Sequence, residues 1–300
     1  MTAVPSLGRL EELCLGLSPR SSIVEASRVQ MCLQARKLEE SIPDALAGHH
    51  TGPLHDARVA GRRLRAGAGI FRSLYPGTWK MAERGGRAVT SGFRDARDLD
   101  IRAARFRRMA VDAKGRPPGS LALIRMLQEQ TAVARTELAG HVRPLAEILP
   151  ASLLAGLWRP RHTGVPAADR CVRVRLGQLA QRVAMLIPVA CVEGRGGVQH
   201  HLRIRCKALR YSLEMMEWRL GSEASWRLGT LRKIQDELGE LHDIDVFWGY
   251  LEERSGQNAI RRPGRLRDLV RGLEQERHRR FEGFLDLREG LEKVLAPITF

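Results

Sequence analysis

Apolar side chains recur every three or four residues along nearly the whole chain of 300 residues, which is the spacing of one face of an α-helix. Alternating β-branched stretches bounded by turns, which would indicate strands, are nearly absent. The pattern predicts an all-α protein. Helices are expected over about residues 21–40, 54–75, 78–112, 119–138, 141–157, 168–187, 197–219, 222–255 and 263–297, the last broken near Gly283 or Gly290.

Proline and glycine separate the predicted helices. Proline cannot continue a helix hydrogen-bond ladder, and glycine tolerates the backbone angles of turns. Breaks are therefore expected at Pro43, Gly52-Pro53, Pro76-Gly77, Gly115 to Gly119, Pro160 to Pro166, Gly194 to Gly197, Gly221 and Arg262-Pro263.

One helix motif occurs twice. HDARVAGRRLR begins at His55, and HHLRIRCKALR begins 145 positions later at His200. The same shift, without a net gap, aligns Asp98-Leu99-Asp100 with Asp243-Ile244-Asp245, and Arg87 with Arg232. Two motifs with one offset predict a tandem duplication. The expected organisation is an N-terminal extension (1–20), a first helical bundle (21–160) and a second (167–298), with about four helices in each bundle and the boundary in the Pro160 to Pro166 linker.

The net charge of +16 predicts an anionic partner. The chain has 50 Lys and Arg against 34 Asp and Glu, and only six of the 50 are lysines. The planar guanidinium group matches phosphate oxygens bidentately and stays charged, so an excess of arginine favours a phosphate ligand. Arginine-rich codon usage is an alternative explanation of the ratio of Arg to Lys, but it does not account for the positive sign.

The repeated motif places cations in a stripe. On a helix, positions 0, +3, +7 and +10 fall within an arc of roughly 80°. Like charges at this spacing repel and require a counter-charge, and cations near a helix N-terminus oppose the helix dipole, whereas anions are attracted there. The alternative is a solvated face with intramolecular acidic partners. The match between two helices favours a bound anion, with the histidines as hydrogen-bond donors and not as catalysts. The stripes are His55, Arg58, Arg62 and Arg65, and His200, Arg203, Lys207 and Arg210.

Carboxylates form the second repeated motif. Asp98 follows Arg87 by eleven residues, and Asp243 follows Arg232 by the same distance. These carboxylates are expected to orient arginines of the facing stripe. An alternative takes His242-Asp243 with Asp245 as a metal-dependent phosphohydrolase site. The first half argues against this reading, because Arg97 occupies the position that corresponds to His242. The stripes contain no His or carboxylate cluster at ligand spacing, and the five cysteines form no CxxC pair, so no metal or cofactor is expected.

The motifs HxxRVxxRRLR at His55, HxLRIRxKxLRY at His200 and the paired RDLD and HDID segments resemble the CHAD family, over about residues 20 to 298. The resemblance implies two pseudo-symmetric helical bundles around a basic central groove that binds inorganic polyphosphate, with a location at polyphosphate granules. It implies as ligand-contacting residues His55, Arg58, Arg62, Arg65, His200, Arg203, Lys207 and Arg210, with Arg87 and Arg232 added. Gly61, Gly67 and Gly69 depart from good helix formers, and Ala208 stands where the first half has Arg63, so the second half is expected to be less basic.

These observations predict a non-enzymatic polyphosphate-binding protein. A nucleic-acid-binding protein is the first alternative, but only 15 Trp, Tyr and Phe are present, and none is interleaved with the stripes to stack on bases. A phosphohydrolase is the second, and it would need a metal cage or a general base. No apolar run approaches the roughly 20 residues that span a bilayer, and acids interrupt the N-terminal segment where a signal peptide would be apolar, so a cytoplasmic location is expected.

Overall fold

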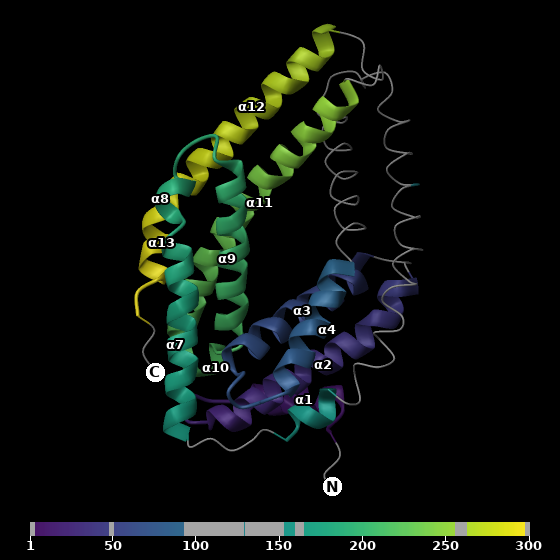
Figure 1. The fold of residues 1–300 in the computed structure, drawn as a ribbon, viewed down its shortest axis with the longest axis vertical. Helices are drawn as coiled ribbons and strands as arrows, with labels where there is room; N and C mark the ends of the chain where they lie inside the picture. Colours follow the sequence, from purple (N-terminus) through teal and green to yellow (C-terminus); the bar gives the residue numbers. More distant parts are fainter. Residues whose placement is uncertain are drawn as a thin grey trace.

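The computed structural model describes residues 4–47, 51–92, 129, 153–159, 165–255 and 263–297, and the structural statements below concern those residues. This part of the chain is all-helical, as predicted. Its helices are α1 (Leu7–Leu15), α2 (Ile23–Ala47), α3 (Thr51–Ile70), α4 (Thr78–Gly92), α7 (Val165–Ala184), α8 (Ile187–Ala190), α9 (Gly196–Glu214), α10 (Glu217–Leu220), α11 (Ser222–Ser255), α12 (Pro263–Asp286) and α13 (Arg288–Val294) (Figure 1). Residues 93–112 of the predicted helix 78–112, all of 119–138 except residue 129, and most of 141–157 lie outside the described residues.

Two groups of helices meet along α3 and α9. In the first group α3 packs between α2 and α4, and in the second α11 packs against α9 and α12. Helix α7 contacts α9, α2 and α3, so it spans the junction between the groups. Figure 1 shows α11 and α12 as a long pair that extends beyond α9. One continuous hydrophobic core joins the groups, with Leu38 and Leu64 on one side and Leu209 and Leu231 on the other.

The two copies of the repeated motif both lie on helices, His55 to Arg65 within α3 and His200 to Arg210 within α9. The duplication itself stays a prediction.

The predicted break at Pro43 is wrong, because α2 continues through this residue to Ala47. Pro43 removes one backbone donor, but Ile42 and Ala45 on either side are 4% and 3% exposed and continue the buried face of α2. One turn earlier the Ser41 hydroxyl donates to the Lys37 carbonyl oxygen at 2.6 Å. Core packing therefore holds the helix across the proline.

The break in the last predicted helix falls at Leu287, between α12 and α13, and not at either glycine. A Cβ atom at Gly283 would lie 3.2 Å from the Glu237 carboxyl carbon of α11. A Cβ atom at Gly290 would lie 3.3 Å from the Thr230 side chain of the same helix. Both glycines thus permit close helix packing instead of ending a helix.

Helix α1 was not among the predicted helices and lies within the segment expected to be an extension. The Ser6 hydroxyl caps its N-terminus by accepting from the Arg9 amide, and Leu10 is fully buried in the core.

The glycines of α3 also have packing roles. A Cβ atom at Gly86 of α4 would lie 2.5 Å from the Gly61 carbonyl oxygen, so α3 and α4 approach each other through this pair. A Cβ atom at Gly67 would collide with the Met31 sulfur and would lie 2.8 Å from the Met215 methyl group. The low helix propensity of these glycines is the cost of close helix contacts.

In the part of the chain that the structure describes, no helix is both long and apolar enough to cross a bilayer.

Candidate functional site

A cavity of about 1130 Å³ lies between α3 and α9, with further walls from α4, α7 and α11. Both predicted stripes open into it, so they share one space. Eight of the ten predicted site residues line it, namely His55, Arg58, Arg62, Arg65, Arg87, His200, Arg203 and Lys207.

The stripe of α3 faces the cavity because the other face of the helix packs into the hydrophobic core. Leu54, Ala57, Leu64 and Ala68 are buried on that face. The stripe is steadied by Thr90 of α4, whose carbonyl oxygen accepts from Arg58 at 3.5 Å and whose hydroxyl accepts from Arg65 at 3.3 Å.

Burial and neighbouring cations lower the pKa of one arginine in the α3 stripe. Burial lowers the pKa of Arg65, and the neighbouring charge of Arg87 lowers it further. Arg87 itself pairs with Glu83 on α4, with 2.7 Å between its Nη2 and the carboxylate. The first wall of the cavity is therefore built from closely spaced cations.

Helix α9 is amphipathic in the same way as α3. Leu202, Cys206, Leu209 and Leu213 are buried, while the opposite side presents the second stripe. The Arg203 guanidinium group lies over Gly239 of α11, where a Cβ atom would be 3.5 Å from its Nε.

Lys207 is the most perturbed cation of the cavity. Burial, together with the charges of Arg203 and Arg62, lowers its pKa to about 6, and Asp243 opposes the shift. The free protein therefore holds Lys207 largely neutral at pH 7, beside arginines that remain charged. A bound anion would reverse this balance.

Two histidines that line the cavity lie against each other. The rings of His200 and His242 lie 3.9 Å apart between centroids and are tilted by 36°. Burial, together with the charges of His200, Arg203 and Lys207, lowers the pKa of His242 to about 4. His242 is thus a neutral imidazole near pH 7, and its place in the cavity lining was not predicted from the sequence.

Arg210, a predicted ligand-contacting residue, does not line the cavity. Its Nη1 donates to Glu214 at 2.6 Å, its Nε donates to Gln235 at 2.9 Å, and its guanidinium carbon lies 4.4 Å from the centroid of the Tyr211 ring. The Glu214 carboxylate also accepts from Arg63 of α3 at 2.7 Å. Arg210 therefore belongs to a bridge between the two stripe-bearing helices.

Tyr211 reinforces this bridge, because its hydroxyl accepts from Nη1 of Arg62 at 3.3 Å. Arg232, the other predicted residue outside the cavity lining, is exposed on α11. Because Arg210 does not line the cavity, the stripe on α9 contributes one residue fewer than the sequence predicts.

The carboxylates of the second motif separate in space. Asp243 lines the cavity, whereas Asp245 accepts from Nε of Arg277 on α12 at 2.8 Å. Asp245 therefore pairs with an arginine outside the stripes. Asp98 and Asp100 lie outside the described residues.

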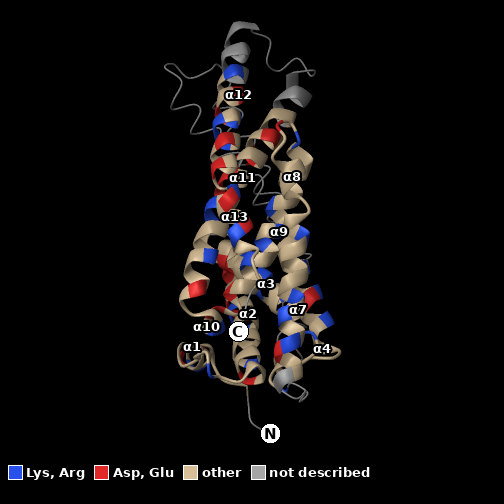
Figure 2. Ribbon diagram, turned by 90° about the vertical axis from the view of Figure 1, so that its left-hand side faces the viewer, with Lys and Arg blue, Asp and Glu red and all other residues tan. Residues whose placement is uncertain are grey.

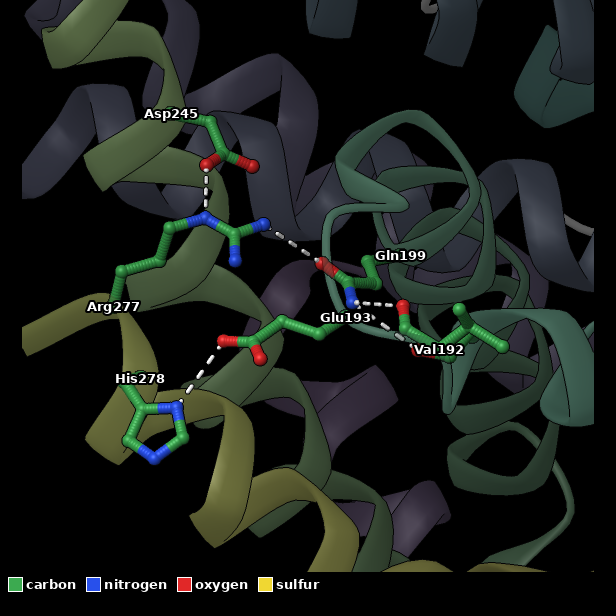
Figure 3. A network of polar contacts seen from close by, with 7 residues as sticks. Val192, Glu193, Gln199, Asp245, Arg277 and His278 are labelled. Carbon is green, nitrogen blue, oxygen red and sulfur yellow. Dashed lines mark hydrogen bonds and ion pairs between the residues drawn. The ribbon is translucent and has the colours of Figure 1, made fainter. Parts of the chain in front are cut away.

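The Asp245–Arg277 pair belongs to a network that anchors the start of α9 (Figure 3). Arg277 donates from Nη2 to the Gln199 side chain at 3.4 Å, and buried Gln199 donates to the Ala190 and Val192 carbonyl oxygens. A Cβ atom at Gly196 would lie 2.6 Å from an Asp245 oxygen, so this carboxylate reaches the first turn of α9. The network holds that turn directly before His200.

The structure adds cations that the sequence analysis missed. Arg72 follows Arg65 by seven residues and continues the α3 stripe just past the end of that helix, a signal that the period of the stripe could have revealed. Arg175 and Arg182 reach the cavity from α7. They belong to no repeated motif, so only the packing of α7 reveals them.

The cavity is strongly cationic. Its described lining contains nine Lys and Arg side chains and two carboxylates, Glu83 and Asp243. Figure 2 shows basic residues recurring along α7 and α9, while many acidic residues lie on α11, α12 and α13. Among the described residues, no group of three or more His, Cys, Asp or Glu is arranged to hold a metal ion.

Comparisons with known proteins agree with this architecture. The sequence model of the CHAD domain matches residues 30–252. The crystal structure of the CHAD domain from the plant Ricinus communis is similar at 21% identity, with a TM-score of 0.63, and the match covers 94% of each chain. No curated protein shows significant sequence similarity to this chain.

Proposed function

The chain belongs to the CHAD domain family, and from this premise we propose that its cavity binds inorganic polyphosphate and catalyses no reaction. The observation that carries the proposal is the shared cavity, into which α3 contributes Arg58, Arg62 and Arg65 and α9 contributes Arg203 and Lys207. Cations that converge from two sides on one space suit a ligand with negative charge along its length.

Polyphosphate fits the chemistry of these side chains. Each internal phosphate carries one charge and exposes oxygens that an arginine fork can bind bidentately. Binding would relieve the repulsion among crowded guanidinium groups and release counterions from the polymer. The affinity is therefore expected to fall steeply as salt concentration rises.

The carboxylates of the cavity support binding more than hydrolysis. Glu83 is held by Arg87, and Asp243 lies close enough to Lys207 to oppose the lowering of its pKa. A phosphohydrolase needs a free general base or a metal cage beside the phosphate. We therefore propose a binding role, with recruitment to polyphosphate granules as its cellular consequence.

Nucleic acid is the competing ligand class, and binding of labelled long-chain polyphosphate at several salt concentrations, with excess DNA as competitor, distinguishes the two. The wild type is compared with Arg58→Ala/Arg203→Ala and with Arg84→Ala/Arg205→Ala. The control removes the same charge from exposed positions on α4 and α9 outside the cavity lining.

The proposal predicts binding that resists DNA and is lost in the cavity variant but kept in the control. Weak binding that DNA displaces, equal in both variants, would reduce the protein to a generic basic surface. Release of phosphate that a chelator abolishes would instead indicate an enzyme.

A further inference from the structure

We propose that α7 is a third binding wall of the cavity, on which Arg175 and Arg182 contact the same polyanion as the two stripes. This inference rests on the proposed function and extends it to a helix that lacks the repeated His and Arg motif. Arg175, Gln178, Leu179 and Arg182 of α7 all line the cavity.

The phase of α7 explains why these side chains reach the ligand space. Ala168, Val172, Leu176, Ala180 and Val183 are buried and fix one face of the helix against the core. Arg175 and Arg182 are seven residues apart, so they lie within about 20° of one another, separated by about 10.5 Å along the helix axis. The two arginines thus form a short stripe on one flank.

Among the described residues, the acid of α7 does not offset the charges on this flank. Arg175 donates from Nη1 to the Gln178 side chain at 2.9 Å, a neutral partner that positions the guanidinium group without offsetting its charge. The described acid of α7, Asp169, pairs with Arg219 at 3.2 Å and does not line the cavity. The two arginines therefore add positive charge to this side of the cavity, and an anion bound there would neutralise it.

The position of α7 makes the contact geometrically direct. The helix packs against both α9 and α3, and its Leu179 lines the cavity together with Ile204 of α9. A ligand held by the two stripes therefore meets α7 as a third side. The polyanion is surrounded by cations from α3, α9 and α7, with Arg87 added from α4, instead of lying on a flat basic surface.

The test compares Arg175→Ala/Arg182→Ala with Arg170→Ala/Arg173→Ala in the full-length chain, using labelled polyphosphate at four salt concentrations. Arg170 and Arg173 are exposed, lie about 140° and 160° around α7 from Arg175, and do not line the cavity. Both variants lose two positive charges from one helix, so the comparison separates contact from net charge. Thermal unfolding confirms that each variant is folded, and Arg175→Gln/Arg182→Gln provides a second cavity variant.

A binding wall predicts that the cavity pair weakens binding at least about 10-fold and reduces the slope of log Kd against log salt by about 1.4, the loss of two phosphate contacts. The control pair should change the affinity less than about 2-fold. If wild type binds and both pairs behave alike, the wall is refuted while polyphosphate binding stands. If wild type does not bind, the proposed function fails and the wall fails with it.

Discussion

Polyanion binding should be coupled to proton uptake by Lys207. Burial and the charges of Arg203 and Arg62 lower the pKa of this lysine to about 6 in the free protein. At pH 7.5 only about 3% of such a group is protonated. Burial and the arginines disfavour the charged form of the amine, whereas a phosphate beside it favours that form. Binding therefore raises the pKa of Lys207.

The magnitude follows from linkage. If the ligand raises the pKa of Lys207 to about 9, the affinity should decrease roughly 20-fold between pH 7.0 and pH 8.5. The bound state takes up nearly one proton per site at neutral pH. The pKa of His242 is about 4 in the free protein, and a variant of Lys207 separates proton uptake by the lysine from uptake by the histidines.

The assay is calorimetric titration of polyphosphate across this pH range, in two buffers with different ionisation enthalpies. The difference in observed enthalpy between the buffers gives the number of protons bound. Lys207→Met is the matched variant, because it keeps an unbranched apolar stem but cannot be protonated. Wild type should show proton uptake that the variant lacks, and equal uptake by both proteins would refute the reasoning.

Three further predictions concern stability, each measured by urea unfolding. The folded-state pKa of Lys207 lies below its ordinary value of 10.5. Between about pH 6 and 10.5 the folded protein therefore binds fewer protons than the unfolded chain. The free energy of unfolding should consequently rise with pH over this range. Lys207→Met should accordingly raise the free energy of unfolding at pH 7 by about 1–4 kcal/mol, and no gain would contradict the buried, cation-crowded position. Glu214→Gln should lower it by about 2–4 kcal/mol, because the 5% exposed carboxylate pairs with both Arg63 and Arg210; a neutral effect would mean that the bridge contributes nothing. Gly86→Ala should cost about 1–3 kcal/mol because the added Cβ atom would lie 2.5 Å from the Gly61 carbonyl oxygen, whereas Gly69→Ala, with no atom within 4 Å of its Cβ position, should cost nothing.

The all-helical fold and the shared phase of the stripe residues could be predicted because both depend on periodicity, which is a local property. The phase of Arg58, Arg62 and Arg65 relative to the buried leucines determines which way they point once α3 packs. Pro43 shows the limit of local rules, because tertiary packing of Ile42 and Ala45 overrides the helix break that proline favours.

The rest of the site depends on contacts between helices. Glu214 lies one turn after Arg210, so the local ion pair was visible in the sequence, but its second partner, Arg63, lies 151 residues away. Nothing in the spacing of Arg175 and Arg182 indicated that α7 would face the stripes. Their place became apparent only when the packing of α7 against α3 and α9 was known.

The central claim is that both stripes hold one polyanion in one shared cavity, and the stoichiometry of binding tests it most directly. Short polyphosphate of a single defined length is titrated into wild type, Arg58→Ala and Arg203→Ala. The account predicts one site per chain, weakened by either substitution because Arg58 and Arg203 line the same space. Two sites per chain, with each substitution abolishing one and leaving the other intact, would contradict it.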